Sequence, residues 1–205
     1  MIAIVDYGMG NLGSISNMLK KIGIQSSISS DPRVIDEAEK LILPGVGAFD
    51  LGMKNITERG LLDSLNVQAL ERKKPILGLC LGMQLFTRAS EEGHVQGLGW
   101  LDAKTVRFKF SAADAHLKIP HMGWNTLQIR RSHPLLSDLG TDPRFYFVHS
   151  FHVQCSDNGK VLATTNYGYD FPSVVVQDNI LGAQFHPEKS HKFGLRLLKN
   201  FTELV

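Results

Sequence analysis

The strongest indication of chemistry in the 205-residue sequence is Cys80, a cysteine inside the apolar run PILGLCLGMQLF (75–86). Gly78 and Gly82 flank it in the pattern Gly-x-nucleophile-x-Gly, which is typical of a sharp turn from a strand into a helix. Such a turn forces the central side chain out of the sheet, and the helix N-terminus favours its thiolate form. The backbone N–H of Leu81 is then placed to donate to an oxyanion. The alternative is a buried, inert cysteine in a glycine-flanked strand.

A thiol nucleophile needs a general base, and the base needs an acceptor that orients it. His186 in AQFHPEKS (183–190) fits, since Pro187 ends an apolar strand beside it and Glu188 follows two positions after it. Residues two apart at a strand end can face the same side, so one short loop can present both side chains. The order Cys…His-x-Glu is that of a convergent triad on an α/β scaffold. Cys80, His186 and Glu188 are therefore the predicted catalytic residues.

The other histidines and the second cysteine give weaker signals. Four histidines are interpreted as hydrogen-bonded core or surface residues, namely His94, His116, His133 and His191. Three lie in aromatic strand segments and their role stays open, namely His121, His149 and His152. Two cysteines make neither a metal-binding pattern nor a disulfide framework. Cys155 is interpreted as structural.

The elements that must position these residues alternate between strand and helix in the first half of the chain. Apolar runs predict strands at 2–8, 26–29, 40–47 and 75–80. Helical spacing predicts helices at 11–23, 49–71 and 82–90, with Asn11 as the N-cap of the first. Because these strands are uninterrupted apolar runs, they are expected to be buried on both faces of a parallel sheet flanked by helices.

The second half of the chain is rich in strand-like segments separated by short turns. These segments are 99–108, 120–130, 144–153, 161–168, 172–179 and 180–188. Residues 111–118 are expected to be a loop, and an amphipathic helix at 192–204 ends the pattern. We therefore predict a single α/β domain over residues 1–205, with a mixed, mostly parallel sheet and flanking helices.

Composition excludes several classes of function. Lys and Arg number 22 against 20 Asp and Glu, and no basic stripe is dense enough to indicate nucleic-acid binding. The apolar N-terminal run is too short for a signal peptide and lacks a basic flank, and nothing approaches a membrane span. We expect a soluble cytoplasmic protein with no metal and no cofactor.

Two segments carry a family resemblance. PILGLCLGMQLF and GAQFHPEKS resemble the class I glutamine amidotransferases. Within that family, four further segments are similar to the glutaminase subunits of imidazole glycerol phosphate synthase: LPGVGAF (43–49), GLGW (97–100), PHMGWN (120–125) and YFVHS (146–150). The matches run from the first strand to LLKNF (197–201), so they cover essentially the whole chain.

The resemblance implies a flavodoxin-like class I glutamine amidotransferase fold and a reaction. Cys80 would attack the side-chain amide of L-glutamine, form a glutamyl thioester and release ammonia, while His186 moves protons and Glu188 orients it. The ammonia would pass within a heterodimer to a cyclase subunit of (β/α)8-barrel fold. That subunit would make imidazole glycerol phosphate and AICAR in histidine biosynthesis. The glutaminase would stay slow until the partner holds its own ligand.

The resemblance also assigns oxyanion and substrate residues. Val46 and Gly47 match an oxyanion strand whose peptide flips to complete an oxyanion hole with Leu81, which glycine neighbours make plausible. The substrate residues it implies are Gln84, Glu92, His149, Ser150 and Phe151. The alternatives are a helix-surface role for Gln84, a solvated Glu91–Glu92 pair, and a plain strand-ending turn at residues 44–47.

A docking face near the cavity mouth is implied as well. The residues placed there are segment 7–11 with Asn11, then Met122, Trp124, Asn125 and Lys189. Met and Trp are favoured at the centres of interfaces, although core packing is an alternative for Trp124.

Two other functions are consistent with the sequence. A near-identical glutaminase could supply ammonia for sugar amidation in surface-polysaccharide biosynthesis, which EKSHKFG (188–194) weakly favours. A catalytically idle scaffold, or a related thiol hydrolase or peptidase, is the third reading, and the complete triad weighs against it.

Overall fold

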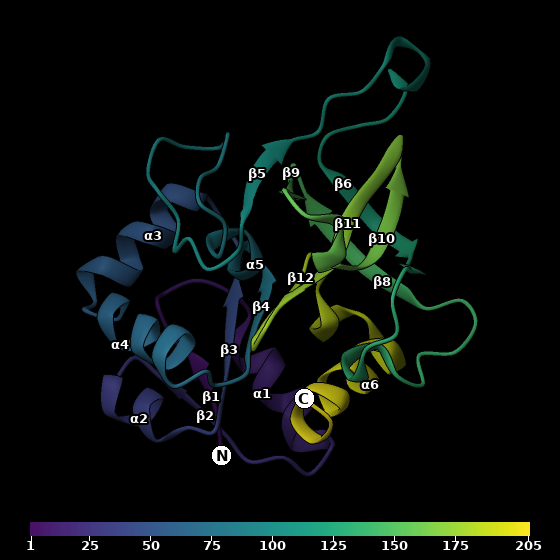
Figure 1. Ribbon diagram of the computed structural model, residues 1–205. Coiled ribbons are helices and arrows are strands. Elements are labelled where there is room, and N and C mark those ends of the chain that lie inside the picture. Colours follow the sequence, from purple (N-terminus) through teal and green to yellow (C-terminus); the bar gives the residue numbers. More distant parts are fainter.

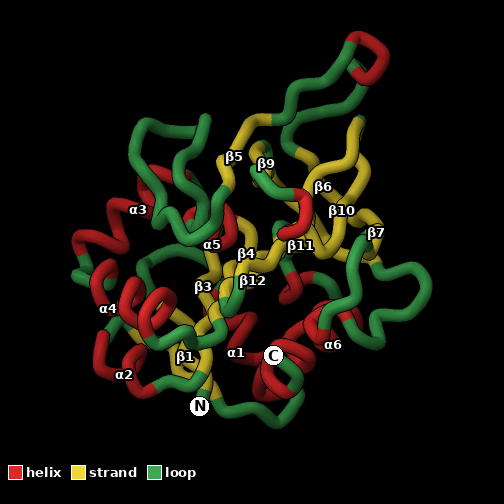
Figure 2. The backbone as a smooth tube through the Cα atoms, viewed as in Figure 1, coloured by secondary structure: helices red, strands yellow, loops and turns green.

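The computed structural model describes residues 1–205 and is built around one eight-stranded sheet (Figures 1 and 2). The strand order is β2-β1-β3-β4-β12-β11-β10-β7. The parallel part comprises β1 (Ile2–Val5), β2 (Ser26–Ser29), β3 (Lys40–Gly45), β4 (Ile76–Cys80) and β12 (Ile180–Ala183). The antiparallel part comprises β11 (Tyr169–Gln177), β10 (Val161–Tyr167) and β7 (Gln128–Ile129). The predicted mixed, mostly parallel sheet is confirmed.

Two antiparallel strand pairs stand beside the main sheet. They are β5 (Ala103–Arg107) with β9 (Phe151–Cys155), and β6 (His121–Thr126) with β8 (Arg144–His149). The long connection between β5 and β6 projects from the body and carries a short 3₁₀ turn at its tip, Ala112–Asp114 (Figure 2). Most of the segment expected to be a loop, 111–118, is irregular.

The helices cover both faces of the sheet. They are α1 (Leu12–Lys21), α2 (Pro32–Glu37), α3 (Phe49–Glu58), α4 (Leu62–Asn66), α5 (Leu81–Leu85) and α6 (His191–Glu203), with a π-helical turn at Val67–Glu71. In Figure 1, α1 and α6 lie on one side of the sheet, and α2, α3 and α4 lie on the other. None of them combines the length and the apolar character that a membrane span requires.

Alternation along β1 shows why the sheet is covered on both sides. Ile2 and Ile4 belong to the hydrophobic cluster that includes residues of α1 and α6. Ala3 and Val5 belong to the cluster that includes residues of α2, α3 and α4. Successive side chains of a strand point to opposite faces, so an uninterrupted apolar run fits burial on both.

Two predicted helices are shorter in the structure. The helix expected over 49–71 is interrupted after α3, where Gly60 adopts a φ of +67° and lets the chain turn. The helix expected over 82–90 ends at Leu85, and the carbonyls of Leu85 and Phe86 accept hydrogen bonds from Leu98 and Leu101. The returning segment thus takes the acceptors that a longer helix would need.

Candidate active site

Cys80 lies at a strained turn between β4 and α5. Its φ is 51° and its ψ is −107°, a backbone conformation that costs a non-glycine residue on the order of 1–3 kcal/mol. A Cβ at Gly82 would overlap the carbonyl oxygen of Leu43, and a Cβ at Gly78 would lie 2.7 Å from the backbone nitrogen of Met83. The two glycines therefore permit a close approach of strand and helix, as the motif predicts.

His186 follows β12, the strand next to β4, and its backbone N–H donates to the carbonyl of Tyr146. Its Nδ1 is 2.9 Å from Glu188 Oε1, and both side chains are almost completely buried. Asn11 Nδ2 donates to the same carboxylate oxygen at 2.9 Å. Asn11 was expected to cap α1, but its side chain makes no capping hydrogen bond and is used on Glu188 instead.

Electrostatics favour a charged form of this pair. Burial lowers the pKa of His186, but its interactions with Cys80 and with Glu188 outweigh burial and raise the pKa to about 10. Burial works to raise the pKa of Glu188, but hydrogen bonds from His186 and Asn11 outweigh it and leave that pKa lowered. At neutral pH the imidazole is thus protonated. Its buried Nε2 makes no hydrogen bond within the protein, which leaves its proton available to a group bound in the cavity.

Cys80 and His186 line the same cavity, whose volume is about 240 Å³. That volume lies below the range of drug-sized pockets and suits a ligand as small as an amino acid. Its lining residues are Val46, Gly47, Cys80, Leu81, Gln84, Glu92, Pro120, Val148, His149, Ser150, Phe151 and His186. The structure brings together every residue named above as an oxyanion or substrate residue, although their roles stay predictions.

Gln84 and Glu92 do not fit the alternative roles considered above, namely a helix-surface residue for Gln84 and one of a solvated Glu91–Glu92 pair for Glu92. Gln84 is only 4% exposed, so it is not a helix-surface residue. Glu92 Oε2 accepts a hydrogen bond from the backbone N–H of Phe49 at 2.9 Å, and burial raises the pKa of this carboxyl. Glu91 instead pairs with Lys109 at the surface and does not line the cavity.

The oxyanion segment follows β3. Val46 is about half exposed, and Gly47 has a φ of +128°. Few residues other than glycine adopt this conformation, so the chain retains the backbone freedom that a peptide flip requires. Whether the peptide flips stays a prediction.

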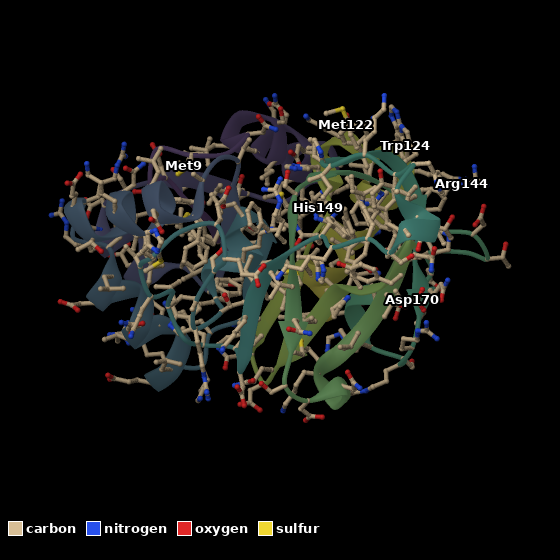
Figure 3. The ribbon with its side chains drawn as sticks, turned by 90° about the horizontal axis from the view of Figure 1, so that it is seen from above. Met9, Met122, Trp124, Arg144, His149 and Asp170 are labelled. Atoms are coloured by element: carbon tan, nitrogen blue, oxygen red, sulfur yellow. The ribbon has the colours of Figure 1, made fainter.

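The residues of the implied docking face are only partly outward-facing. Met122 and Trp124 are 62% and 47% exposed, and they project at one edge of the molecule (Figure 3). Core packing is therefore wrong for Trp124, whose ring stacks on His191. Lys189 Nζ lies 5.4 Å from the ring centroid of Tyr146. Asn11 is partly buried, and its side chain contacts Glu188. The side chain of Asn125 points inward and contacts His121.

Two residues of segment 7–11 are buried, so their side chains are not part of an exposed face. Met9 is 8% exposed, and Tyr7 is completely buried. Glycine at position 45 leaves room for its hydroxyl, because a Cβ there would overlap that oxygen.

Sequence reasoning missed Gln184, whose Nε2 is 3.7 Å from Cys80 Sγ. A signal was available, because Gln184 lies two positions before His186 and alternate strand positions face the same side. It also missed Pro120 and Val148, which line the cavity. Of the histidines left open, His149 lines the cavity, and His121 does not line it but lies within hydrogen-bond distance of His149.

A nucleophilic cysteine at the carboxyl end of a central parallel strand, with its base on the adjacent strand, is the arrangement of α/β enzymes that form covalent intermediates. The family follows from comparison with known proteins. The chain belongs to the class-I glutamine amidotransferases, whose family model matches residues 3–204.

Curated relatives match the chain over nearly its full length. "Imidazole glycerol phosphate synthase subunit HisH 2" of Methanococcus maripaludis is 55% identical over 99% of both chains. The protein of the same name from Pseudomonas aeruginosa is 49% identical over 100% of both. Subunit HisH of Sulfurimonas denitrificans is 50% identical over 99% of this chain and 98% of its own.

Solved structures agree on the fold. A glutamine amidotransferase crystal structure superposes with a TM-score of 0.74 at 23% identity, covering 100% of this chain and 98% of the other. A putative GMP synthase subunit from Thermoplasma acidophilum gives a TM-score of 0.71 at 21% identity, covering 98% and 90%. The expected class I glutamine amidotransferase fold is thereby confirmed.

Proposed function

We propose that this chain is the glutaminase subunit of an imidazole glycerol phosphate synthase. It hydrolyses L-glutamine to glutamate and ammonia, and the ammonia is used by a cyclase subunit in histidine biosynthesis. The observation that carries the proposal is the 55% identity over nearly the full length to a relative named as a subunit of that synthase. The cavity that joins Cys80 to His186 supports the chemistry.

The first half of the reaction forms a thioester. The Cys80 thiolate attacks the side-chain carboxamide carbon of glutamine, and the carbonyl oxygen becomes an oxyanion. The backbone N–H groups of Leu81 and of a turned Gly47 are the proposed donors to that oxyanion. His186 Nε2 then gives its proton to the amide nitrogen, the C–N bond breaks, and ammonia leaves.

The second half returns the enzyme to its starting state. Neutral His186 takes a proton from water as the water oxygen attacks the thioester carbon. The C–S bond breaks, glutamate leaves, and the Cys80 thiolate again faces an imidazolium. Glu188 holds the imidazole by Nδ1 throughout, so that Nε2 stays directed at the reacting atoms.

Substrate binding uses the rest of the cavity. Glu92 is the proposed partner of the α-ammonium group of glutamine, because its carboxylate lines the cavity and burial raises its pKa, so that a cation beside it would favour its charged form. Gln84 and the segment His149–Phe151 are proposed to hold the remaining polar groups of the substrate.

The partner is a cyclase subunit, which we propose has a (β/α)8-barrel fold and forms a cytoplasmic heterodimer with this chain. The exposed Met122 and Trp124 support a docking face close to the cavity, because Pro120 on the same segment lines the cavity itself. The alternative of sugar amidation is not favoured, since the relatives above are named for imidazole glycerol phosphate synthase.

The test is a glutaminase assay with and without the cyclase subunit and its ligand. We expect slow hydrolysis by the isolated chain and strong acceleration by the liganded partner, with no hydrolysis by Cys80→Ala. Circular dichroism and partner binding of Cys80→Ala should match the wild type, because a buried thiol is replaced by a smaller side chain. Ammonia release by Cys80→Ala would contradict the assignment of the triad. Equal rates of hydrolysis with and without the partner would contradict the assignment to a synthase.

A further inference from the structure

The sulfur of Cys80 has a second polar neighbour besides the catalytic histidine. Gln184 Nε2 lies 3.7 Å from Cys80 Sγ, and the Gln184 side chain is completely buried. The register of the parallel strands explains the contact, since Ala183 pairs with Leu79 and the next residues on each strand are Gln184 and Cys80. On its other side, the sulfur is 4.0 Å from the carbonyl oxygen of Val148.

The orientation of the Gln184 amide is fixed by its own acceptor. Gln84 Nε2 donates to Gln184 Oε1 at 3.2 Å and to the carbonyl oxygen of Phe151 at 2.9 Å. Because Gln184 Oε1 faces the Gln84 amide, its NH₂ group must face Cys80. A flipped Gln184 would set two NH₂ groups against each other and leave an oxygen against the thiolate.

Two neutral histidines, His149 and His121, continue the hydrogen-bonded network beyond the Phe151 carbonyl. The Phe151 carbonyl also accepts from His149 Nδ1 at 2.7 Å, which leaves His149 Nε2 as an acceptor for His121 Nδ1 at 3.0 Å. His121 Nε2 in turn accepts from Asn125 Nδ2 at 3.2 Å. Burial lowers the pKa of His121 to about 4, and burial together with His121 holds the pKa of His149 well below its ordinary value.

Each hydrogen bond of this network has one assigned donor, and the Phe151 carbonyl accepts from both His149 and Gln84. Asn125 has no free amide hydrogen, because its Nδ2 also donates to the carbonyl of Asn166 and its Oδ1 accepts from Thr126. The hydrogen bonds therefore connect β6, the strand that carries Met122 and Trp124, through His149 to the sulfur. His149 lies in the interior of the molecule (Figure 3). A satisfied buried network of this kind fixes one arrangement of its members.

We infer that Gln184 is a catalytic residue that donates an amide N–H to the Cys80 thiolate, with His121 and His149 as positioning residues behind it. The inference deepens the proposed function, because it assigns a role in the same thiol chemistry. A donor on the sulfur stabilises its negative charge before attack and again when the thioester breaks and the thiolate leaves. The imidazolium of His186 is then free to donate its proton to the leaving nitrogen.

The experiment is alkylation of Cys80 by iodoacetamide between pH 6 and 9, followed by mass spectrometry of the intact chain and its Cys80 peptide. Gln184→Met keeps the side-chain length and removes the donor. We expect alkylation at pH 7 to slow about tenfold and its pH profile to move to higher pH, because a hydrogen bond to a charged group is lost. The matched control is Gln154→Met, at an exposed position of β9, which should alkylate at the wild-type rate.

Two further variants keep the inference testable if Gln184→Met does not fold. Gln184→Leu is apolar and of similar size, so it also removes the donor, and alkylation should slow by about tenfold. His121→Phe keeps the ring packing against Phe147 and Tyr167 but lacks the Nδ1 donor, and it should slow alkylation by a smaller factor. The inference would be overturned if those of the three variants that fold, two at position 184 and one at position 121, were alkylated with the rate and pH profile of the wild type.

The outcome separates this inference from the proposed function. Alkylation needs no glutamine and no partner, so it reports on the sulfur alone. If the wild-type chain hydrolyses no glutamine with its liganded cyclase while Gln184→Met slows alkylation, the proposed function fails and the role of Gln184 at the sulfur stands.

Discussion

At the scale of single residues, the site depends on opposing charges in a small buried volume. His186 and Glu188 are almost completely buried, and burial alone would favour the neutral forms of both. Their mutual contact and the sulfur of Cys80 reverse this for the imidazole. The proposed triad therefore holds a protonated imidazole at neutral pH, which is the form that the proposed reaction needs to protonate the leaving nitrogen.

This charge balance predicts the behaviour of Glu188→Gln. Burial lowers the pKa of His186, and in the wild type Cys80 and Glu188 raise it to about 10, so the imidazole stays protonated well above pH 7. Without the carboxylate the pKa of His186 falls, and the alkaline limb of kcat moves to lower pH. We expect kcat with the liganded partner to fall on the order of a hundredfold or more.

The measurement is the pH profile of kcat for wild type and variant, with Glu91→Gln as the control. Glu91 is a surface carboxylate outside the cavity, so its variant should keep the wild-type profile. An alkaline limb that does not move in Glu188→Gln would contradict the role given to this carboxylate.

Single residues also show what sequence reasoning can reach. Cys80, His186 and Glu188 were predicted from local patterns, namely a glycine-flanked cysteine and a His-x-Glu loop. The structure brings Cys80 and His186 into one cavity and sets Glu188 against His186, and their catalytic roles stay a prediction. The contacts of Asn11 with Glu188 and of Gln184 with Cys80 join residues far apart in the chain. Such contacts depend on strand order and register, which no local pattern specifies.

At the scale of elements, the most important feature is the turn between β4 and α5, because it positions Cys80. The strand was predicted correctly from its apolar run, and so was the sheet buried on both faces. The length of α5 was not predicted correctly. The helix ends where the carbonyl groups of Leu85 and Phe86 accept hydrogen bonds from the returning segment that contains Leu98 and Leu101. Helix ends set by tertiary hydrogen bonds leave no signature in spacing.

The turn predicts a large effect of Gly82→Ala. The added Cβ would overlap the carbonyl oxygen of Leu43, a backbone atom that cannot move aside without shifting β3. We expect a loss of about 2 kcal/mol or more in the free energy of unfolding, and slower Cys80 alkylation because the nucleophile is displaced.

Urea denaturation checks this against Gly13→Ala in α1. No atom lies within 4 Å of the Cβ position at Gly13, so alanine there should stabilise the chain by roughly 0.5–1 kcal/mol. Equal stabilities of the two variants would show that the close approach of Gly82 to β3 is not required.

At the scale of the whole molecule, the cavity and the exposed aromatic edge lie on one continuous segment. Pro120 lines the cavity, while Met122 and Trp124 are exposed a few residues further along β6. The family resemblance predicted that Met122, Trp124 and Asn125 belong to one docking face, but only the structure shows which of them point outward. Alternation on β6 separates Met122 and Trp124 from the inward-facing His121 and Asn125.

The exposed edge predicts a selective effect of Trp124→Ala. Exposed tryptophans near the centre of an interface often contribute 2 kcal/mol or more, so the Kd for the cyclase subunit should rise about thirtyfold or more. Isothermal titration calorimetry measures it, with exposed Leu51→Ala on α3 as the control. Cys80 alkylation should be unchanged in both variants, and an unchanged Kd in Trp124→Ala would place the docking face elsewhere.

The most direct measurement of the central claim follows nitrogen through the complex. The chain and its cyclase subunit are supplied with glutamine labelled with ¹⁵N in the side-chain amide, together with the cyclase substrate and excess unlabelled ammonium at neutral pH. We predict that the imidazole glycerol phosphate formed carries the label, and that Cys80→Ala abolishes the labelling. Unlabelled product, made with nitrogen from the ammonium in solution by a complex that hydrolyses glutamine, would contradict the account.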